Sequence, residues 1–196
     1  EGLKDGIEKV YHLYEVFQVV NEEKIPCWPG PMTVEEYWNG TCNPENLHIS
    51  SSWCYGNAGV MRGLQKVAGY MGWKEKEQAH VETMIRFFSQ NIKTYDLYSP
   101  SLCHGFSSLV AIQMCAYSSY RNPKLLTNLE RHIQKMIAGY RKNNENELNL
   151  TDIRNKSILI EGHLKDLSIL TGSVGIAITL LSLKRKTKTG KLLMID

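Results

Sequence analysis

Two cysteines and one histidine, each placed just before a glycine, are the residues of this sequence whose types and spacing best suit chemistry. Cys54 stands two residues before Gly56, and Cys103 and His104 stand directly before Gly105. Thiolate sulfur and imidazole nitrogen form a donor set whose usual occupant is zinc. Three protein ligands leave the fourth tetrahedral position open, which is the arrangement of a catalytic zinc site. The pattern therefore indicates a zinc site with room for a reactant.

The glycines belong to a pattern that occurs three times: glycine, two residues, glycine or serine, and then an apolar run. Its copies start at Gly56, Gly105 and Gly172. Such self-similarity indicates a repeated supersecondary unit. A glycine there lets the chain turn tightly or approach another backbone just before a helix, whose free N–H groups favour the thiolate form of a nearby cysteine. Because adjacent helical residues diverge by about 100°, Cys103 and His104 can reach one ion only from a turn at the helix start.

The same residues also have plainer interpretations. A cysteine before an apolar helix is often a small buried hydrophobe, and His104 could serve as a capping group. The paired C-x-x-C spacing of zinc fingers is absent. Cys27 and Cys42 lie outside the repeat, and Cys115 falls in the middle of an expected helix, so we interpret these three cysteines as non-ligands.

The strings W-C-Y-G at Trp53–Gly56 and C-H-G at Cys103–Gly105 resemble the signature motifs of the LanC-type lanthionine synthetases. In that family the two cysteines and the histidine of these motifs bind zinc. The glycine unit at Gly172–Gly175 resembles the recurring glycine–helix unit of the family. The resemblance covers most of the chain and corresponds to the second half of a family member. It implies that residues 1–196 are the C-terminal part of a single LanC-like cyclase domain.

The resemblance implies an all-α fold, an α/α toroid of inner and outer helix rings that is partial here, with zinc at the mouth. The implied activity adds peptide cysteine thiols to dehydroalanine or dehydrobutyrine, which forms the thioether rings of (methyl)lanthionine in lantibiotic biosynthesis. The implied partners are a dehydrated precursor peptide and, in a biosynthetic complex, a dehydratase and an export transporter. The alternative is a non-catalytic LanC-like zinc scaffold that binds a thiol such as glutathione. A prenyltransferase-like toroid is disfavoured by the paired motifs.

The sequence departs from the family pattern at the residues that move protons. The histidine and aspartate to which the family assigns acid/base work lie in the first half of a member, which this chain lacks, so the catalytic residues stay unknown. Members commonly carry an arginine four residues before the first ligand cysteine, where this chain has Ser50. His48, on the segment leading into Cys54, is the candidate acid or base within the chain, with a surface histidine as the alternative.

Composition sets the remaining limits. The formal net charge of +3 and the 22% of charged residues are ordinary, and no basic patch interleaved with aromatics indicates a nucleic-acid partner. An odd number of cysteines without framework spacing fits a reducing cytosol, and the chain opens without a signal peptide. The apolar run 174–183 is too short to cross a bilayer, whereas the basic tail 184–191 could touch an acidic membrane surface. We expect a cytoplasmic protein with peripheral membrane association.

Helical periodicity predicts two kinds of helix that alternate along the chain. Those that follow a glycine turn are apolar nearly all round, and those between them are amphipathic. Such alternation is typical of an inner ring packed on both faces and an outer ring with one wet face. Between these helices we expect a long loop over 21–52, a polar insertion over 141–157 and a frayed basic tail. The predicted helices cover residues 3–20, 60–72, 76–92, 106–120, 124–140 and 173–183.

Overall fold

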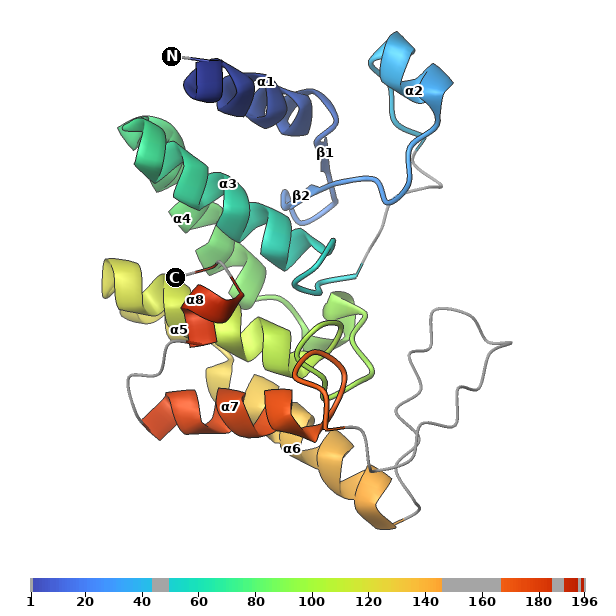
Figure 1. Ribbon diagram of the computed structural model, residues 1–196, viewed down its shortest axis with the longest axis vertical. Coiled ribbons are helices and arrows are strands. Elements are labelled where there is room, and N and C mark those ends of the chain that lie inside the picture. The colour runs from blue at the N-terminus through green and yellow to red at the C-terminus, as the bar shows by residue number, and fades with distance from the viewer. Residues whose placement is uncertain (1, 44–49, 146–166, 185–188, 194, 196) are drawn as a thin grey trace.

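The chain folds into two layers of helices, which confirms the expected all-α class (Figure 1). The computed structural model describes residues 2–43, 50–145, 167–184, 189–193 and 195. Six helices dominate it: α1 (Gly2–Val16), α3 (Asn57–Met71), α4 (Lys74–Phe88), α5 (Phe106–Tyr120), α6 (Leu129–Glu145) and α7 (Ser173–Lys184). The bounds of α5 agree with the predicted ones at both ends, and those of α3, α4 and α7 agree within a few residues.

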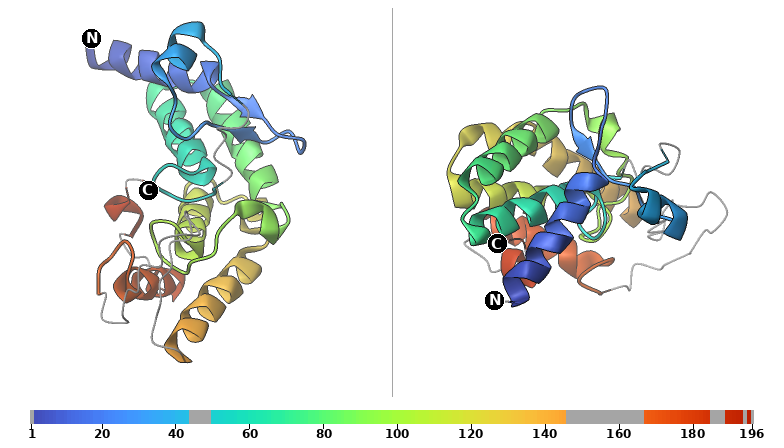
Figure 2. Two further views of the ribbon diagram at one scale, coloured as in Figure 1. Left: turned by 90° about the vertical axis from the view of Figure 1, so that its right-hand side faces the viewer. Right: turned by 90° about the horizontal axis from the view of Figure 1, so that it is seen from above.

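The three helices that follow a glycine turn form one layer. Figure 1 shows α3, α5 and α7 stacked one above another, with α5 in contact with both others. The amphipathic helices supply the second layer, because α4 packs against α3 and α6 packs against α5. Figure 1 and the left view of Figure 2 show α1 at one end of the molecule and α6 and α7 at the other. This alternation is the inner and outer arrangement that the sequence predicts.

Burial follows from the position of each helix in these layers. Helix α5 has neighbours on several sides, and its residues 106–113 are all buried. Helix α4 buries Val81, Met84 and Phe88 on one face and exposes Glu82 and Arg86 on the other, as its pattern predicts.

Helix α7, which we expect to be largely buried in the full-length protein, is partly exposed in this chain. In the structure α7 buries only Gly175, Ile176 and Thr179, while Ala177 and Leu181 are exposed. The cause is geometric, because among the described residues α7 packs against α5 and the short helix α8 (Thr189–Leu192) on one side alone.

The segment before α3 is more structured than predicted. Helix α1 ends at Val16, so the predicted extension to residue 20 is wrong. There the chain forms strand β1 (Val19–Val20), which pairs antiparallel with strand β2 (Pro26–Cys27). The expected loop 21–52 also holds helix α2 (Val34–Asn39), which begins with a capping box between Thr33 and Glu36. His48 lies outside the described residues.

Two expectations near the C-terminal side need correction. The first residues of the expected polar insertion 141–157 are helical, because α6 continues to Glu145, and the rest of it lies outside the described residues. The expected frayed tail is wrong over 189–191, which belong to α8, and Leu193 directly after that helix is buried. Within the described ranges, the structure contains no helix with the length and apolar content needed to cross a membrane.

Candidate metal centre

The turns before α3 and α5 bring the three predicted ligands together. Cys54 precedes Gly56, the N-cap of α3, while Cys103 and His104 precede Gly105, the N-cap of α5. His104 Nε2 lies 3.1 Å from Cys54 Sγ and 3.8 Å from Cys103 Sγ. All three candidate ligand atoms lie within 4.8 Å of one another. Both cysteines and the histidine thus face one point from turns at helix starts, as expected.

The spacing of these atoms fits zinc. Tetrahedral zinc with sulfur at about 2.3 Å and nitrogen at about 2.0 Å places neighbouring ligand atoms roughly 3.5–3.8 Å apart. Of the two sulfur–nitrogen distances, 3.8 Å lies at the upper end of that range and 3.1 Å is somewhat shorter. Within the described part of the chain, no other group of histidine, cysteine and acidic side chains could hold a metal ion. Cys27, Cys42 and Cys115 form no disulfide among the described residues and take no part in the ligand group.

Close backbone contact explains why glycine occupies the turns. A Cβ atom on Gly56 would lie 2.1 Å from Ser52 N, and one on Gly105 would lie 2.1 Å from Ser99 O. The φ angles of these glycines, −89° and −134°, are open to other residues. Of the two reasons that the sequence offered for glycine, the approach of a second backbone is therefore the one that applies.

The hydrogen bonds of the turns repeat as well. Asn57 N donates to Ser50 O at 3.0 Å in the first turn, and Phe106 N donates to Ser99 O at 2.9 Å in the second. Each bond joins the first residue of a helix to the residue seven positions earlier. The repeat seen in the sequence is therefore a repeat of backbone geometry, in which the preceding loop folds back on the helix start.

The three turns are also bonded to one another. Trp53 N donates to Cys103 O at 3.3 Å, and Cys103 N donates to Leu170 O at 2.8 Å. The third copy carries no metal-competent side chain, yet its backbone holds the ligand turn of the second. A Cβ at Gly175 would lie 1.9 Å from Ile169 O, just as one at Gly59 would lie 1.9 Å from Trp53 O, so the third turn repeats a close contact of the first.

The environment of Cys54 favours its thiolate. A hydrogen bond with Cys103 is the main cause that lowers the pKa of the Cys54 thiol to about 6. The charge of His104 and hydrogen bonds from Ser52 and the Tyr55 backbone act in the same direction, while burial opposes them. A thiol with this pKa is mostly deprotonated at neutral pH, which is the form that binds metals.

Tyr55 is part of the site, although sequence reasoning gave it no role. Its hydroxyl lies 3.2 Å from His104 Nε2, and the two rings meet edge to face at 5.5 Å. Tyr55 is 50% exposed, so it lies at the solvent-facing side of the ligand group. The signal was available in the sequence, because Tyr55 lies inside the W-C-Y-G motif directly after Cys54.

Two cavities meet at Cys54. One, of about 490 Å³, is walled by Tyr14, Trp28 and residues 29–31 and reaches Cys54 and Tyr55. The other, of about 610 Å³, lies between α1 and α3, and its lining is mostly glycine and aliphatic. A substrate can therefore approach the exposed Cys54 end of the ligand group.

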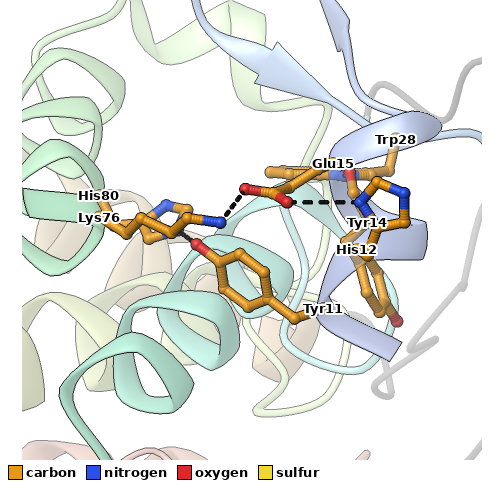
Figure 3. A network of polar contacts seen from close by, with 7 residues as sticks. All are labelled: Tyr11, His12, Tyr14, Glu15, Trp28, Lys76 and His80. Atoms are coloured by element: carbon orange, nitrogen blue, oxygen red, sulfur yellow. Dashed lines mark hydrogen bonds and ion pairs between the residues drawn. The ribbon is translucent and has the colours of Figure 1, made fainter. Parts of the chain in front are cut away.

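Helix α1, which contributes to both cavities, is fastened to α4 by a polar cluster (Figure 3). Tyr11 Oη and His80 Nε2 lie 2.6 Å apart, and Lys76 Nζ lies 2.6 Å from Glu15 Oε1. Lys76 also lies over the Tyr11 ring, 4.7 Å from its centroid. Burial of Tyr11 and the charge of Glu15 raise the pKa of the Tyr11 hydroxyl to about 12, so it stays protonated.

Comparison with known proteins places this geometry in a family. A family model described as lanthionine synthetase C-like protein matches residues 1–194. Among solved structures, nisin cyclase matches with a TM-score of 0.73 at 16% sequence identity, over 98% of this chain and 44% of that chain. This likeness shows the fold, a partial α/α toroid, and this chain spans less than half of nisin cyclase. A search of curated proteins finds no matching sequence. The chain belongs to the lanthionine synthetase C-like family.

Proposed function

We propose that this chain is the zinc-holding C-terminal part of a lanthipeptide cyclase domain. Its substrate is a dehydrated precursor peptide, and its reaction adds cysteine thiols to dehydroalanine or dehydrobutyrine residues to form thioether rings. The observation that carries the proposal is the convergence of Cys54, Cys103 and His104 in a chain of this family. The likeness of the fold to nisin cyclase supports it.

The three side chains would hold a zinc ion through two sulfurs and one nitrogen. When bound, zinc supplies the Lewis acidity that keeps a substrate thiol in its thiolate form near neutral pH. Two thiolates give the donor set more negative charge than three imidazoles would, which keeps an incoming sulfur nucleophilic. The exposed position of Cys54 between two cavities leaves this side of the ligand group open to a peptide.

Ring closure also requires the movement of one proton. The substrate sulfur bonds to Cβ of the dehydro residue, its thiol proton is lost, and Cα gains a proton, so no oxidant or reductant is needed. A general acid must deliver the second proton. We assign this acid, and the base that accepts the first proton, to a preceding part of the domain, with His48 as the candidate within this chain.

Exposed apolar surface at both ends of the inner layer supports the proposal that the domain is larger. At one end the aliphatic cavity between α1 and α3 has no occupant among the described residues. At the other end Leu180 and Leu181 of α7 are 36% and 55% exposed. In stacked repeats, surfaces of this kind are covered by neighbouring units. Residues 1–196 would then form the C-terminal part of one toroid.

The test is ring closure by the full-length protein. Because closure leaves the mass of the precursor unchanged, it is measured by counting the precursor cysteines that can still be alkylated. Full-length protein with zinc should protect cysteines in the dehydrated precursor, and Cys103→Ala should abolish protection. Cys115→Ala should retain it, because Cys115 lies mid-helix outside the ligand group. A zinc-loaded protein that binds glutathione but protects no cysteine would refute the cyclase and favour the scaffold.

A further inference from the structure

The segment around α8 is anchored in the helix layers by its side chains. Leu193 and Ile195 are 2% and 4% exposed, and α8 contacts both α5 and α7 (Figure 1). Ile195 N donates to Gly190 O at 2.8 Å, which closes the segment into a compact turn. We call residues 189–193 and 195 the anchor segment. The basic run 184–191, which overlaps the start of this segment, gave no indication of the burial.

The anchor segment is bonded to the residue that precedes the first ligand. Trp53 Nε1 donates to Leu193 O at 3.0 Å, across 140 positions of sequence. The backbone of Trp53 is held as well, because its N–H donates to Cys103 O at 3.3 Å. Its carbonyl is pressed against α3, where a Cβ on Gly59 would lie 1.9 Å away. Trp53 is thus fixed at its amide, its carbonyl and its indole.

A second hydrogen bond joins the anchor segment to α3, the helix that follows Trp53. Arg62 on α3 is 1% exposed, and its Nε donates to Ile195 O at 2.7 Å. Its other nitrogens donate to Gln65 and to Ser119 Oγ, the latter at 3.0 Å. If the segment moved away, a buried guanidinium would lose a charge-assisted hydrogen bond, which is costly. The segment is therefore a fixed support against which the Trp53 indole rests.

These contacts matter for the ligand geometry because Cys54 is the only candidate ligand on its turn. Cys103 and His104 are adjacent and share one turn, which the hydrogen bond from Cys103 N to Leu170 O fastens to the turn before α7. The position of Cys54 relative to them depends on the turn that Trp53 begins. A tilt of the indole would move the Cα of the next residue and change the sulfur–nitrogen distance of 3.1 Å.

We infer that the anchor segment, acting through the Trp53 indole, holds Cys54 in position for metal binding. Trp53 is on this view a positioning residue, since its indole binds the Leu193 carbonyl and donates to none of the three ligand atoms. The inference rests on the proposed zinc site. Residues behind the ligands of a metal site typically change metal affinity by about 10–100-fold when replaced.

The experiment measures zinc affinity by competition with a chromophoric chelator, beside thermal unfolding of each metal-free protein. Trp53→Phe keeps an aromatic ring but removes the N–H donor to Leu193 O. It should weaken zinc binding about tenfold or more. Trp73→Phe is the matched control, because Trp73 lies at the turn between α3 and α4 and meets the Tyr11 ring edge to face. It should leave zinc affinity within about twofold of the wild type.

A second variant approaches from the other side. Leu193→Ser keeps the backbone carbonyl but replaces a buried apolar side chain with a small polar one. The anchor segment should then be held less firmly, so zinc binding should also weaken. The double variant Trp53→Phe/Leu193→Ser should bind zinc no more weakly than the worse single variant, because both act through one contact. A lowered melting temperature in Trp53→Phe with unchanged zinc affinity would overturn the inference and leave the zinc site intact. A wild-type protein that binds no zinc would overturn both.

Discussion

The replacement Gly105→Ala tests whether close backbone contact builds the ligand turns. The new Cβ would lie 2.1 Å from Ser99 O and 2.6 Å from Ser101 N, where 3.4 Å is the lower end of ordinary contact. The loop before α5 must therefore move by more than an ångström. That movement breaks the bond from Phe106 N to Ser99 O and the one from Ser107 Oγ to Pro100 O.

The cost has two parts. Two buried hydrogen bonds contribute roughly 1 kcal/mol each, and overpacking of a filled site adds about 1–3 kcal/mol. We expect Gly105→Ala to lower the free energy of unfolding by roughly 3–5 kcal/mol. For a chain of this size each kcal/mol corresponds to about 2–4 °C, so the melting temperature should fall by about 10 °C. Zinc binding should weaken too, because His104 directly precedes the displaced glycine.

A matched glycine gives the opposite prediction. Gly63 lies inside α3, and a Cβ there would meet nothing within 4 Å. Gly63→Ala should therefore stabilise the protein by about 0.5–1 kcal/mol, because alanine loses less backbone entropy in a helix. Urea unfolding followed by circular dichroism measures both variants. If the two replacements changed the free energy of unfolding alike, close contact would not explain the glycine turns.

Two further predictions concern the helix layers. Ala111→Asp should destabilise the protein by about 3 kcal/mol or more, since it places an unpaired charge at a position that is 3% exposed. Arg131 is exposed, so Arg131→Ala should change the free energy of unfolding in urea by less than about 0.5 kcal/mol. Burial lowers the pKa of His132 from 6.5 to about 4, so its contribution of about 3 kcal/mol is present above pH 6.5 and lost as pH falls toward 4. His132→Gln should flatten the dependence of urea stability on pH in that window, and an unchanged slope would contradict this account.

The sequence predicted the parts of this protein in which pattern and packing agree. Helix α5 was predicted to the residue, because the glycine turn marks its start and its residues are apolar nearly all round. Helix geometry required Cys103 and His104 to lie in a turn before α5 if both were to reach one ion, since adjacent side chains diverge inside a helix, and the structure has them there. The exposure of one face of α4 followed from its polar stripe.

The missed features depend on contacts between distant residues. Strands β1 and β2 are two residues each, too short for an alternating pattern. Helix α2 had a signal, the T-x-x-E of Thr33 and Glu36, within a segment whose prolines and glycines favoured a loop. The anchor segment follows a basic run, 184–191, that is typical of a free end, and its burial depends on Arg62 and Trp53, far away in sequence.

Arg62 itself illustrates the limit. A charged residue in a helix is expected to face solvent, yet this guanidinium is fully buried among Gln65, Ser119 and the Ile195 carbonyl. Those partners come from α3, α5 and the anchor segment. No local pattern can specify them, because a buried cation is tolerated only when all of its partners are assembled in three dimensions.

The most direct test of the central claim is the zinc content of the purified, folded protein. The proposed site predicts about one zinc per chain, with a sharp loss in each of Cys54→Ala, Cys103→Ala and His104→Ala. Cys27→Ala and Cys115→Ala should retain the wild-type content, because neither cysteine belongs to the ligand group. Loss of zinc in Cys115→Ala together with full zinc content in Cys54→Ala would contradict the assignment.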